Sequence, residues 1–236
     1  MAKQKQKQKS SVNILTLWPT TILSKRFAHH QKVNPVLIDL VYKHRDREQR
    51  NPKTSYASKD DLLNQYPLHK ELNELADFFR EGIFEISKAS NEGMWKDSDT
   101  VKINMTGLWF QISNGFAFHE THVHGNCSWS GVYYVQAGDS SESRESIKPG
   151  EQPNGITRFY GPNMENMAGG YGDYGNFYLH DSSWDSYPQD GKLVIFPSYL
   201  KHMVFPYNGR NDRVIFSFHA QVDKKGGLSY DYSMAN

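Results

Sequence analysis

The first third of the chain carries apolar residues at the spacing of an amphipathic helix. Between residues 72 and 86 they recur every three or four positions, which predicts one helix that faces the core. These positions are Leu72, Leu75, Ala76, Phe79, Ile83 and Ile86. Ser58 with Asp61 forms a candidate capping box before a helix at Leu62. Upstream, residues 12–18 alternate well enough to predict an opening strand that Pro19 ends.

After about residue 101 the pattern changes to short runs typical of β-strands. The runs are residues 107–113, 130–136, 156–160, 192–196 and 213–219. Helices followed by short, regularly spaced strands predict an α+β fold, a double-stranded β-helix (jelly roll) whose N-terminal helices pack on one sheet. Chain length favours a single domain over residues 11–236. Residues 1–10 alternate Lys and Gln, have nothing to bury, and are expected to form a disordered tail.

The segment between residues 137 and 190 is rich in Gly, Ser, Asn and Tyr, with one strand near residue 156. Long loops inside a compact domain occur mainly as lids or binding loops. The part from 161 to 190 is therefore either a lid over a ligand or an ordered surface loop.

Charge and cysteine content narrow the class of partner and compartment. Lys and Arg number 27 against 26 Asp and Glu, so neither nucleic acid nor a membrane surface is expected, and a small-molecule or peptide substrate fits better. The single cysteine, Cys127, excludes an internal disulfide and favours a reducing compartment, by default the cytoplasm. No apolar run approaches the roughly 20 residues of a membrane span. The oligomeric state stays open.

The triplet His122-Val123-His124 is a candidate metal site. Residues two apart on an extended segment point to the same face, so both imidazoles can reach one ion. His202 begins a later strand, and the turn signal Asn208-Gly209 predicts a hairpin from it to the strand 213–219. In that hairpin the third histidine would lie across the strand pair from Arg213. Three imidazoles suit iron.

The strand 213–219 has two chemically different faces. Val214, Phe216 and Phe218 form an ordinary core face, whereas Arg213 and Ser217 share the other face. The guanidinium is a planar fork that matches a carboxylate, so this face is predicted to line a cavity that binds an acid. The competing interpretation is a surface arginine on an edge strand.

Together these residues resemble the 2-oxoglutarate/Fe(II)-dependent dioxygenases, whose jelly roll carries H-x-D/E, a later His and then an Arg. The closer likeness is to an uncharacterised branch related to prolyl hydroxylases. The similar stretches are residues 17–20, 122–126, 130–135, 155–162 and 191–207, followed by Arg213.

The resemblance implies an enzyme that binds Fe(II) through His122, His124 and His202. It would decarboxylate 2-oxoglutarate to succinate and CO2 while hydroxylating an unidentified small molecule or peptide side chain. Arg213 would bind the cosubstrate's far carboxylate, with the hydroxyls of Tyr134 and Ser217 beside it.

One position departs from the family pattern. His124 stands where the family has an acid, which would leave three neutral imidazoles at the metal. Alternatively, His124 is not a ligand and an acid reaches in from elsewhere. Glu120 is the nearest candidate, but strand alternation puts it on the face opposite His122 unless a bulge intervenes.

Two other functions stay open: a cupin-type three-histidine metalloenzyme that needs no 2-oxoglutarate, and a non-catalytic jelly-roll binding module. The remaining histidines have ordinary interpretations. Solvent exposure is expected for His29, His30, His44 and His69. His180 is expected in the long loop, and His219 at the far end of the last strand. Cys127 is expected to be a small core residue.

Overall fold

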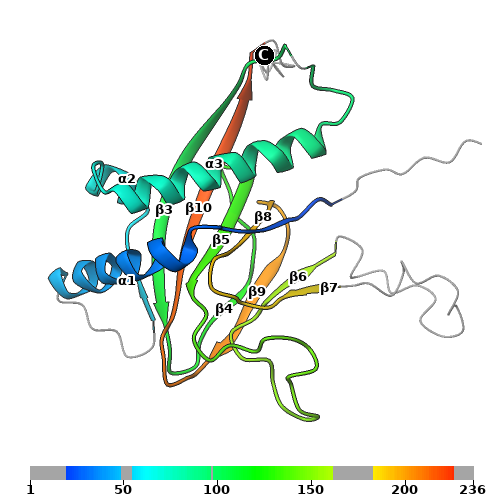
Figure 1. Cartoon of the computed structure of the whole chain (residues 1–236). Coiled ribbons are helices and arrows are strands. Elements are labelled where there is room, and N and C mark those ends of the chain that lie inside the picture. The colour runs from blue at the N-terminus through cyan, green and yellow to red at the C-terminus, as the bar shows by residue number, and fades with distance from the viewer. Residues whose placement is uncertain (1–19, 49–54, 97, 162–182, 226–236) are drawn as a thin grey trace, which may run out of the picture.

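The computed structural model describes residues 20–48, 55–96, 98–161 and 183–225 (Figure 1). The strands are β1 (Leu23–Arg26), β2 (Ser55–Ala57), β3 (Val101–Ser113), β4 (Ala117–His122), β5 (Trp129–Gln136), β6 (Thr157–Tyr160), β7 (Ser183–Ser186), β8 (Lys192–Pro197), β9 (His202–Tyr207) and β10 (Arg213–Lys224). The helices are α1 (His30–Arg47), α2 (Leu62–Gln65) and α3 (Lys70–Ser90). The predicted tail, the opening strand 12–18, His180 and most of the candidate lid lie outside the described residues.

The strands form two antiparallel sheets, as predicted for a double-stranded β-helix. The larger sheet has the order β1-β8-β5-β10-β3-β2, and the smaller has the order β4-β9-β6-β7. The five runs after residue 101 that were predicted as strands are all present, as β3, β5, β6, β8 and β10. Strands β3 and β10 are longer than their apolar runs, because they pair with each other as far as Val101 and Lys224. The short strands β1, β2, β4 and β7 were not predicted.

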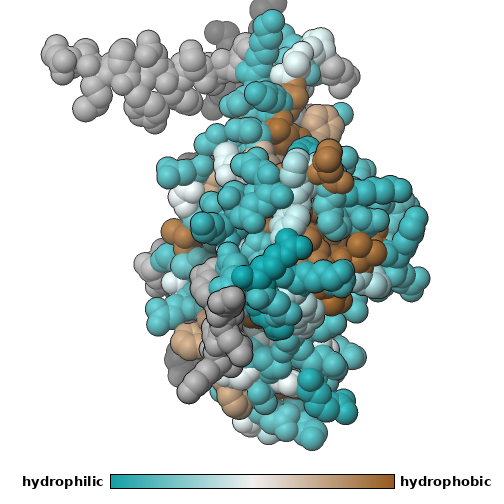
Figure 2. All heavy atoms as spheres, turned by 90° about the vertical axis from the view of Figure 1, so that its left-hand side faces the viewer, coloured by the Kyte–Doolittle hydropathy of each residue, from teal (hydrophilic) through white to brown (hydrophobic). Residues whose placement is uncertain are grey.

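The N-terminal helices pack on the outer face of the six-stranded sheet, as predicted (Figure 1). The whole apolar stripe of α3 is buried, together with apolar side chains of α1, β3, β5, β8 and β10. Each fully buried Leu, Ile or Phe contributes roughly 1.5–3 kcal/mol relative to an exposed one. On the side where α1 and α2 lie, the surface is mainly hydrophilic, with hydrophobic side chains in smaller patches (Figure 2).

The helices α2 and α3 begin in different ways. The predicted capping box is wrong: Asp61 makes no side-chain cap, and the hydroxyl of Ser58 accepts a hydrogen bond from the amide of Phe110 on β3 (3.1 Å). Helix α3 is capped by His69, whose Nδ1 accepts from the amide of Leu72 (3.3 Å). None of the helices in the described part of the chain has the length and apolarity that crossing a membrane requires.

The predicted hairpin between His202 and Arg213 is wrong. Strand β9 pairs with β4 and β6 in the smaller sheet, whereas β10 pairs with β3 and β5 in the larger one. The connection therefore crosses from one sheet to the other. Asn114 and Asp139 fix it from neighbouring loops by binding its backbone amides, those of Gly209, Arg210 and Asn211. His202 and Arg213 face one cavity from opposite sheets.

Candidate functional site

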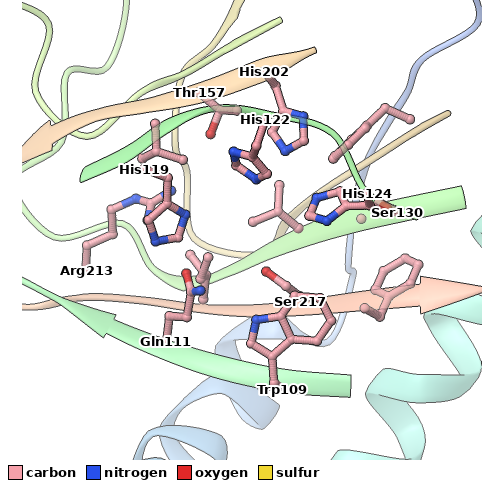
Figure 3. Close-up of a pocket in the computed structure, with 16 residues that line it drawn as sticks. Trp109, Gln111, His119, His122, His124, Ser130, Thr157, His202, Arg213 and Ser217 are labelled. Carbon is pink, nitrogen blue, oxygen red and sulfur yellow. The ribbon is translucent and has the colours of Figure 1, made fainter. Parts of the chain in front are cut away.

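A cavity of about 80 Å³ lies between the two sheets (Figure 3). The four-stranded sheet and its extension contribute imidazoles, and the six-stranded sheet contributes an indole, an amide, a hydroxyl and a guanidinium. These side chains are His119, His122, His124 and His202 on one side, and Trp109, Gln111, Ser217 and Arg213 on the other. Among the described residues that line the cavity there is no Asp or Glu.

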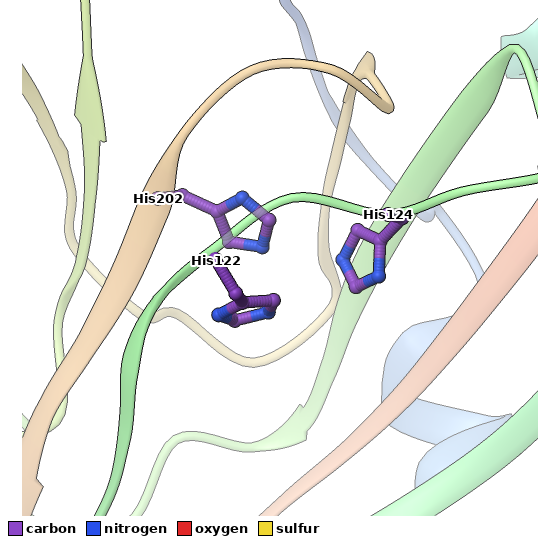
Figure 4. A group of neighbouring side chains, drawn as sticks. All are labelled: His122, His124 and His202. Atoms are coloured by element: carbon purple, nitrogen blue, oxygen red, sulfur yellow. The ribbon is translucent and has the colours of Figure 1, made fainter.

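His122, His124 and His202 converge on one point (Figure 4). One nitrogen of each lies within 4.8 Å of the others, an arrangement that could hold a metal ion. His122 on β4 is directly opposite His202 on β9, and their ring centroids are 4.3 Å apart. His124 follows β4, where its amide donates to the carbonyl of Ser198 (2.9 Å).

Backbone carbonyls fix the tautomers of two of these rings. The Nδ1–H of His122 donates to the carbonyl of Glu120 (2.7 Å), and the Nδ1–H of His202 donates to that of Leu200 (2.9 Å). A carbonyl can only accept, so Nδ1 carries the proton and Nε2 is left with its lone pair. Bonds of this kind orient the histidine ligands of metal sites.

Burial also keeps the imidazoles uncharged. Burial, together with the neighbouring imidazoles, lowers the pKa of His202 to about 4 and that of His124 to about 3. The neutral ring is the form that coordinates a metal. Both side chains are therefore in the coordinating form at pH 7 before any ion binds.

Arg213 is a buried cation with free hydrogen-bond donors. Its side chain is 2 % exposed, and its Nε and Nη2 have no partner among the described residues. Burial lowers the pKa of this guanidinium. The guanidinium carbon, Cζ, lies 5.2 Å from the ring centroid of Tyr134. A buried charge is costly unless an opposite charge accompanies it, so these donors fit an anionic ligand.

The two predicted hydroxyl groups lie at different depths. Ser217 lines the cavity directly. Tyr134 is fully buried behind the lining, and its hydroxyl shares a hydrogen bond with that of Thr157 (3.1 Å), which does line the cavity.

The inner faces of β3 and β10 give the cavity a closed end and an open end. Their facing pairs run from Ser113 and Arg213, through Trp109 and Ser217, to Gly107 and His219. Arg213 is buried, whereas Ser217 and His219 are partly exposed. Arg213 thus marks the closed end.

His219 is closer to the site than predicted from the sequence. Its ring centroid lies 4.7 Å from those of both His124 and Trp109, and its Nε2 is buried without a partner among the described residues. Burial lowers its pKa, which Asp60 partly opposes.

Sequence reasoning missed His119, because a bulge determines where it points. The pairs His119–Val204 and His122–His202 span three residues on β4 but two on β9. The extra residue puts both histidines on the cavity face and leaves Glu120 exposed outside. Burial, then the charge of Arg213, lowers the pKa of His119 to about 4.

Cys127 lies beside the site and is half-buried. Its thiol is 3.0 Å from the hydroxyl of Ser198, which also contacts the hydroxyl of Ser130 (3.0 Å). The thiol is therefore part of a small polar cluster, where a core position was expected.

A family model described as a putative 2OG-Fe(II) oxygenase matches residues 107–219, the stretch that contains every lining residue of the cavity. The match spans 113 of the 236 residues and supports membership of the 2OG-Fe(II) oxygenase superfamily. Such an oxygenase is an oxidoreductase of the class that uses Fe(II) with 2-oxoglutarate as cosubstrate. A sequence search among curated proteins gave no match.

Solved structures with the same fold are distant in sequence. HygX from Streptomyces hygroscopicus, with nickel and 2-oxoglutarate bound, is 10 % identical with a TM-score of 0.51, over 86 % of this oxygenase and 82 % of HygX. AviO1 from Streptomyces viridochromogenes Tue57 is 10 % identical with a TM-score of 0.51, over 85 % and 90 %. A prolyl-4-hydroxylase from Pseudomonas putida is 17 % identical with a TM-score of 0.48, over 85 % and 92 %. The likeness to HygX and AviO1 confirms the double-stranded β-helix.

Proposed function

We propose that this oxygenase hydroxylates a small molecule or a peptide side chain while 2-oxoglutarate is decarboxylated to succinate and CO2. One observation carries the proposal: three converging imidazoles line the same cavity as a buried guanidinium, two of whose nitrogens have no partner among the described residues. The first group suits a metal ion and the second suits an acid, so the cavity offers both requirements of the reaction.

His122, His124 and His202 would hold the Fe(II). The donor chemistry fits, because neutral imidazole suits iron and two of the rings are already held by carbonyls in the coordinating tautomer. When bound, Fe(II) with 2-oxoglutarate and dioxygen supplies the oxidation of a substrate C–H bond. The protein's own task is to orient these reactants and to limit access of water.

Arg213 would pair with the carboxylate of 2-oxoglutarate that lies farther from the metal. Its position at the closed end keeps this ion pair away from water, where a charge-assisted pair is strongest. Ser217 would add a hydroxyl from the same face of β10. Tyr134 would act through Thr157, to which it is hydrogen-bonded.

A second candidate is a three-histidine metalloenzyme that needs no keto acid. It is favoured by the absence of any carboxylate among the described lining residues. The usual non-haem iron site has two imidazoles and one carboxylate, so a site of three neutral ligands leaves the iron with more positive charge. In that case Arg213 would bind an acidic substrate.

An anaerobic titration of the Fe(II) protein with 2-oxoglutarate tests the proposal. The measurement is the weak visible charge-transfer band that a keto acid produces when it chelates Fe(II). His202→Ala should abolish the band, and Arg213→Ala should require far more 2-oxoglutarate to produce it. His29→Ala, an exposed histidine on the opposite face of the sheet that contacts Glu74, is the matched control and should behave as wild type.

The outcomes separate the two candidates. A saturable band that depends on both residues supports the 2-oxoglutarate enzyme and leaves the substrate to be found. If wild-type protein holds iron but gives no band at any concentration of 2-oxoglutarate, the proposal is wrong and the second candidate stands.

A further inference from the structure

Three polar side chains at the closed end of the cavity have unused hydrogen-bonding atoms. The Nε and Nη2 of Arg213 and the Oε1 of Gln111 are buried with no partner among the described residues. His119 lines the same cavity and makes no hydrogen bond to any described residue. Native proteins leave few buried polar atoms unpaired, so the atoms of Arg213 and Gln111, with the His119 ring beside them, point to a ligand.

The fold brings these groups together from three strands. Gln111 lies on β3, one inward-facing position from Ser113, the cross-strand partner of Arg213. The bulge in β4 turns His119 toward them from the opposite sheet. In Figure 3 the His119 ring lies beside the Arg213 guanidinium, and the Gln111 amide lies next to both.

We infer that His119 and Gln111 bind the far carboxylate of the keto acid together with Arg213, and so make the site selective for a keto acid with two acid groups. The inference rests on the proposed function. It gives both residues a role as cosubstrate-binding and specificity-determining groups.

The hydrogen-bond chemistry of the three groups matches a carboxylate. A carboxylate accepts about four hydrogen bonds, and Arg213 alone offers two free donors. A neutral imidazole has one N–H, which His119 can donate, and the amide of Gln111 can turn its NH2 group inward by rotating about its last bond. Each such bond to a charged group is expected to strengthen binding about ten-fold or more.

A purely structural role explains the arrangement less well. A structural histidine bonds its ring to backbone or side chains, as His69 and His30 do. His119 instead lies at a one-residue shift in the register of β4 and β9, and its nitrogens bond to no described residue. Gln111 likewise buries an amide oxygen that has no partner among the described residues. An apolar side chain at this position would fill the space without leaving a polar atom unpaired.

The test compares two keto acids of equal chain length on the anaerobic Fe(II) protein. 2-Oxoglutarate has the far carboxylate, and 2-oxopentanoate has a methyl group in its place. We expect His119→Phe, which keeps a ring but removes the N–H, to weaken 2-oxoglutarate binding about ten-fold or more, the loss typical of a hydrogen bond to a charged group. Binding of 2-oxopentanoate should stay within about two-fold of wild type, because no contact is lost.

Two further variants separate hydrogen bonding from packing. His119→Asn retains an N–H donor and should recover part of the affinity lost in His119→Phe. Gln111→Leu should weaken 2-oxoglutarate about three- to ten-fold, again without affecting 2-oxopentanoate. Circular dichroism and iron content measured for every variant identify any that fail to fold, and the remaining two variants then decide.

The failure of this inference differs from the failure of the proposed function. Equal losses for both keto acids, or no loss in either His119 variant, would overturn the inference while the wild-type band still stood. A wild-type protein that binds iron yet shows no band with either acid would overturn both.

Discussion

The two faces of strand β10 differ in what their side chains contribute. On the outer face, Val214, Phe216 and Phe218 are fully buried among apolar side chains of the helices and neighbouring strands. On the inner face, Arg213 and Ser217 line a small polar cavity, and the guanidinium has donors without partners. Successive residues of one strand thus serve opposite purposes: the outer face stabilises the fold, and the inner face holds groups that reduce stability until a ligand binds.

The packing of the outer face is tight. The rings of Phe79 on α3 and Phe218 on β10 are stacked with centroids 4.6 Å apart. A methyl group at Gly131 on β5 would overlap the ring of Phe218, so the strand can approach only because this position has no side chain. Such packing leaves little free space, and the core can be expected to tolerate little change.

The largest effect should come from the outer face. Phe216→Ala removes a ring that is 0 % exposed and should lower the free energy of unfolding by about 3–5 kcal/mol. Urea unfolding at pH 7.5 measures the loss. The protein that remains folded should bind Fe(II) as wild type does, because Phe216 points away from the cavity. A loss below about 1 kcal/mol would mean that this face is not the main source of stability.

A substitution on the inner face of β10 should raise the free energy of unfolding instead of lowering it. Arg213→Met replaces a buried, unpartnered charge by an apolar side chain of similar length, which should raise the unfolding free energy of the metal-free protein by about 1–3 kcal/mol. The same variant should lose 2-oxoglutarate binding. Arg210→Met is the matched control, since Arg210 is exposed and makes only a long ion pair to Asp139 (3.6 Å); its change should stay within about 0.5 kcal/mol. If Arg213→Met is clearly less stable than wild type, the charge has a partner that this interpretation lacks.

Strand alternation was sufficient to predict both faces of β10, because a period of two depends only on local backbone geometry. The pairing of β9 was not predictable in this way. The Asn208-Gly209 turn signal is local, whereas the partner of β9 depends on side chains distant in sequence, such as Phe159 on β6 opposite His202. The prediction therefore placed His202 and Arg213 at one cavity through a hairpin that does not exist.

Two histidines show the limits of the sequence signal in different ways. His44 was expected in solvent but is buried, with its Nδ1 2.7 Å from the hydroxyl of Tyr66. It continues the helical spacing of Val33, Leu37 and Val41, so periodicity could have found it. His119 had no such signal, since its direction depends on a one-residue bulge that alternation cannot reveal.

A smaller effect should appear in the pH dependence of stability. Burial lowers the pKa of His119 and His202 to about 4, below the value of about 6.5 in an unfolded chain. Between those values the unfolded chain binds more protons, so the metal-free protein should lose stability as pH falls from about 6.5 toward 4. Urea midpoints at pH 7.5 and pH 5 measure this. His202→Gln cannot protonate and should show a weaker dependence; an unchanged slope would argue against burial of His202 as its cause.

The smallest effect should come from Glu120, the acid nearest the three imidazoles in sequence. The bulge turns its neighbour His119 inward, so Glu120 points to solvent and its side chain does not line the cavity. Glu120→Gln should therefore change Fe(II) affinity by less than about two-fold, because an exposed charge outside the cavity is screened by water. Competition with a chelator, measured beside His124→Ala as a positive control for ligand loss, gives the affinity. If Glu120→Gln weakens iron binding as much as His124→Ala does, the acid reaches the metal after all, and the site is the usual pair of imidazoles with one carboxylate.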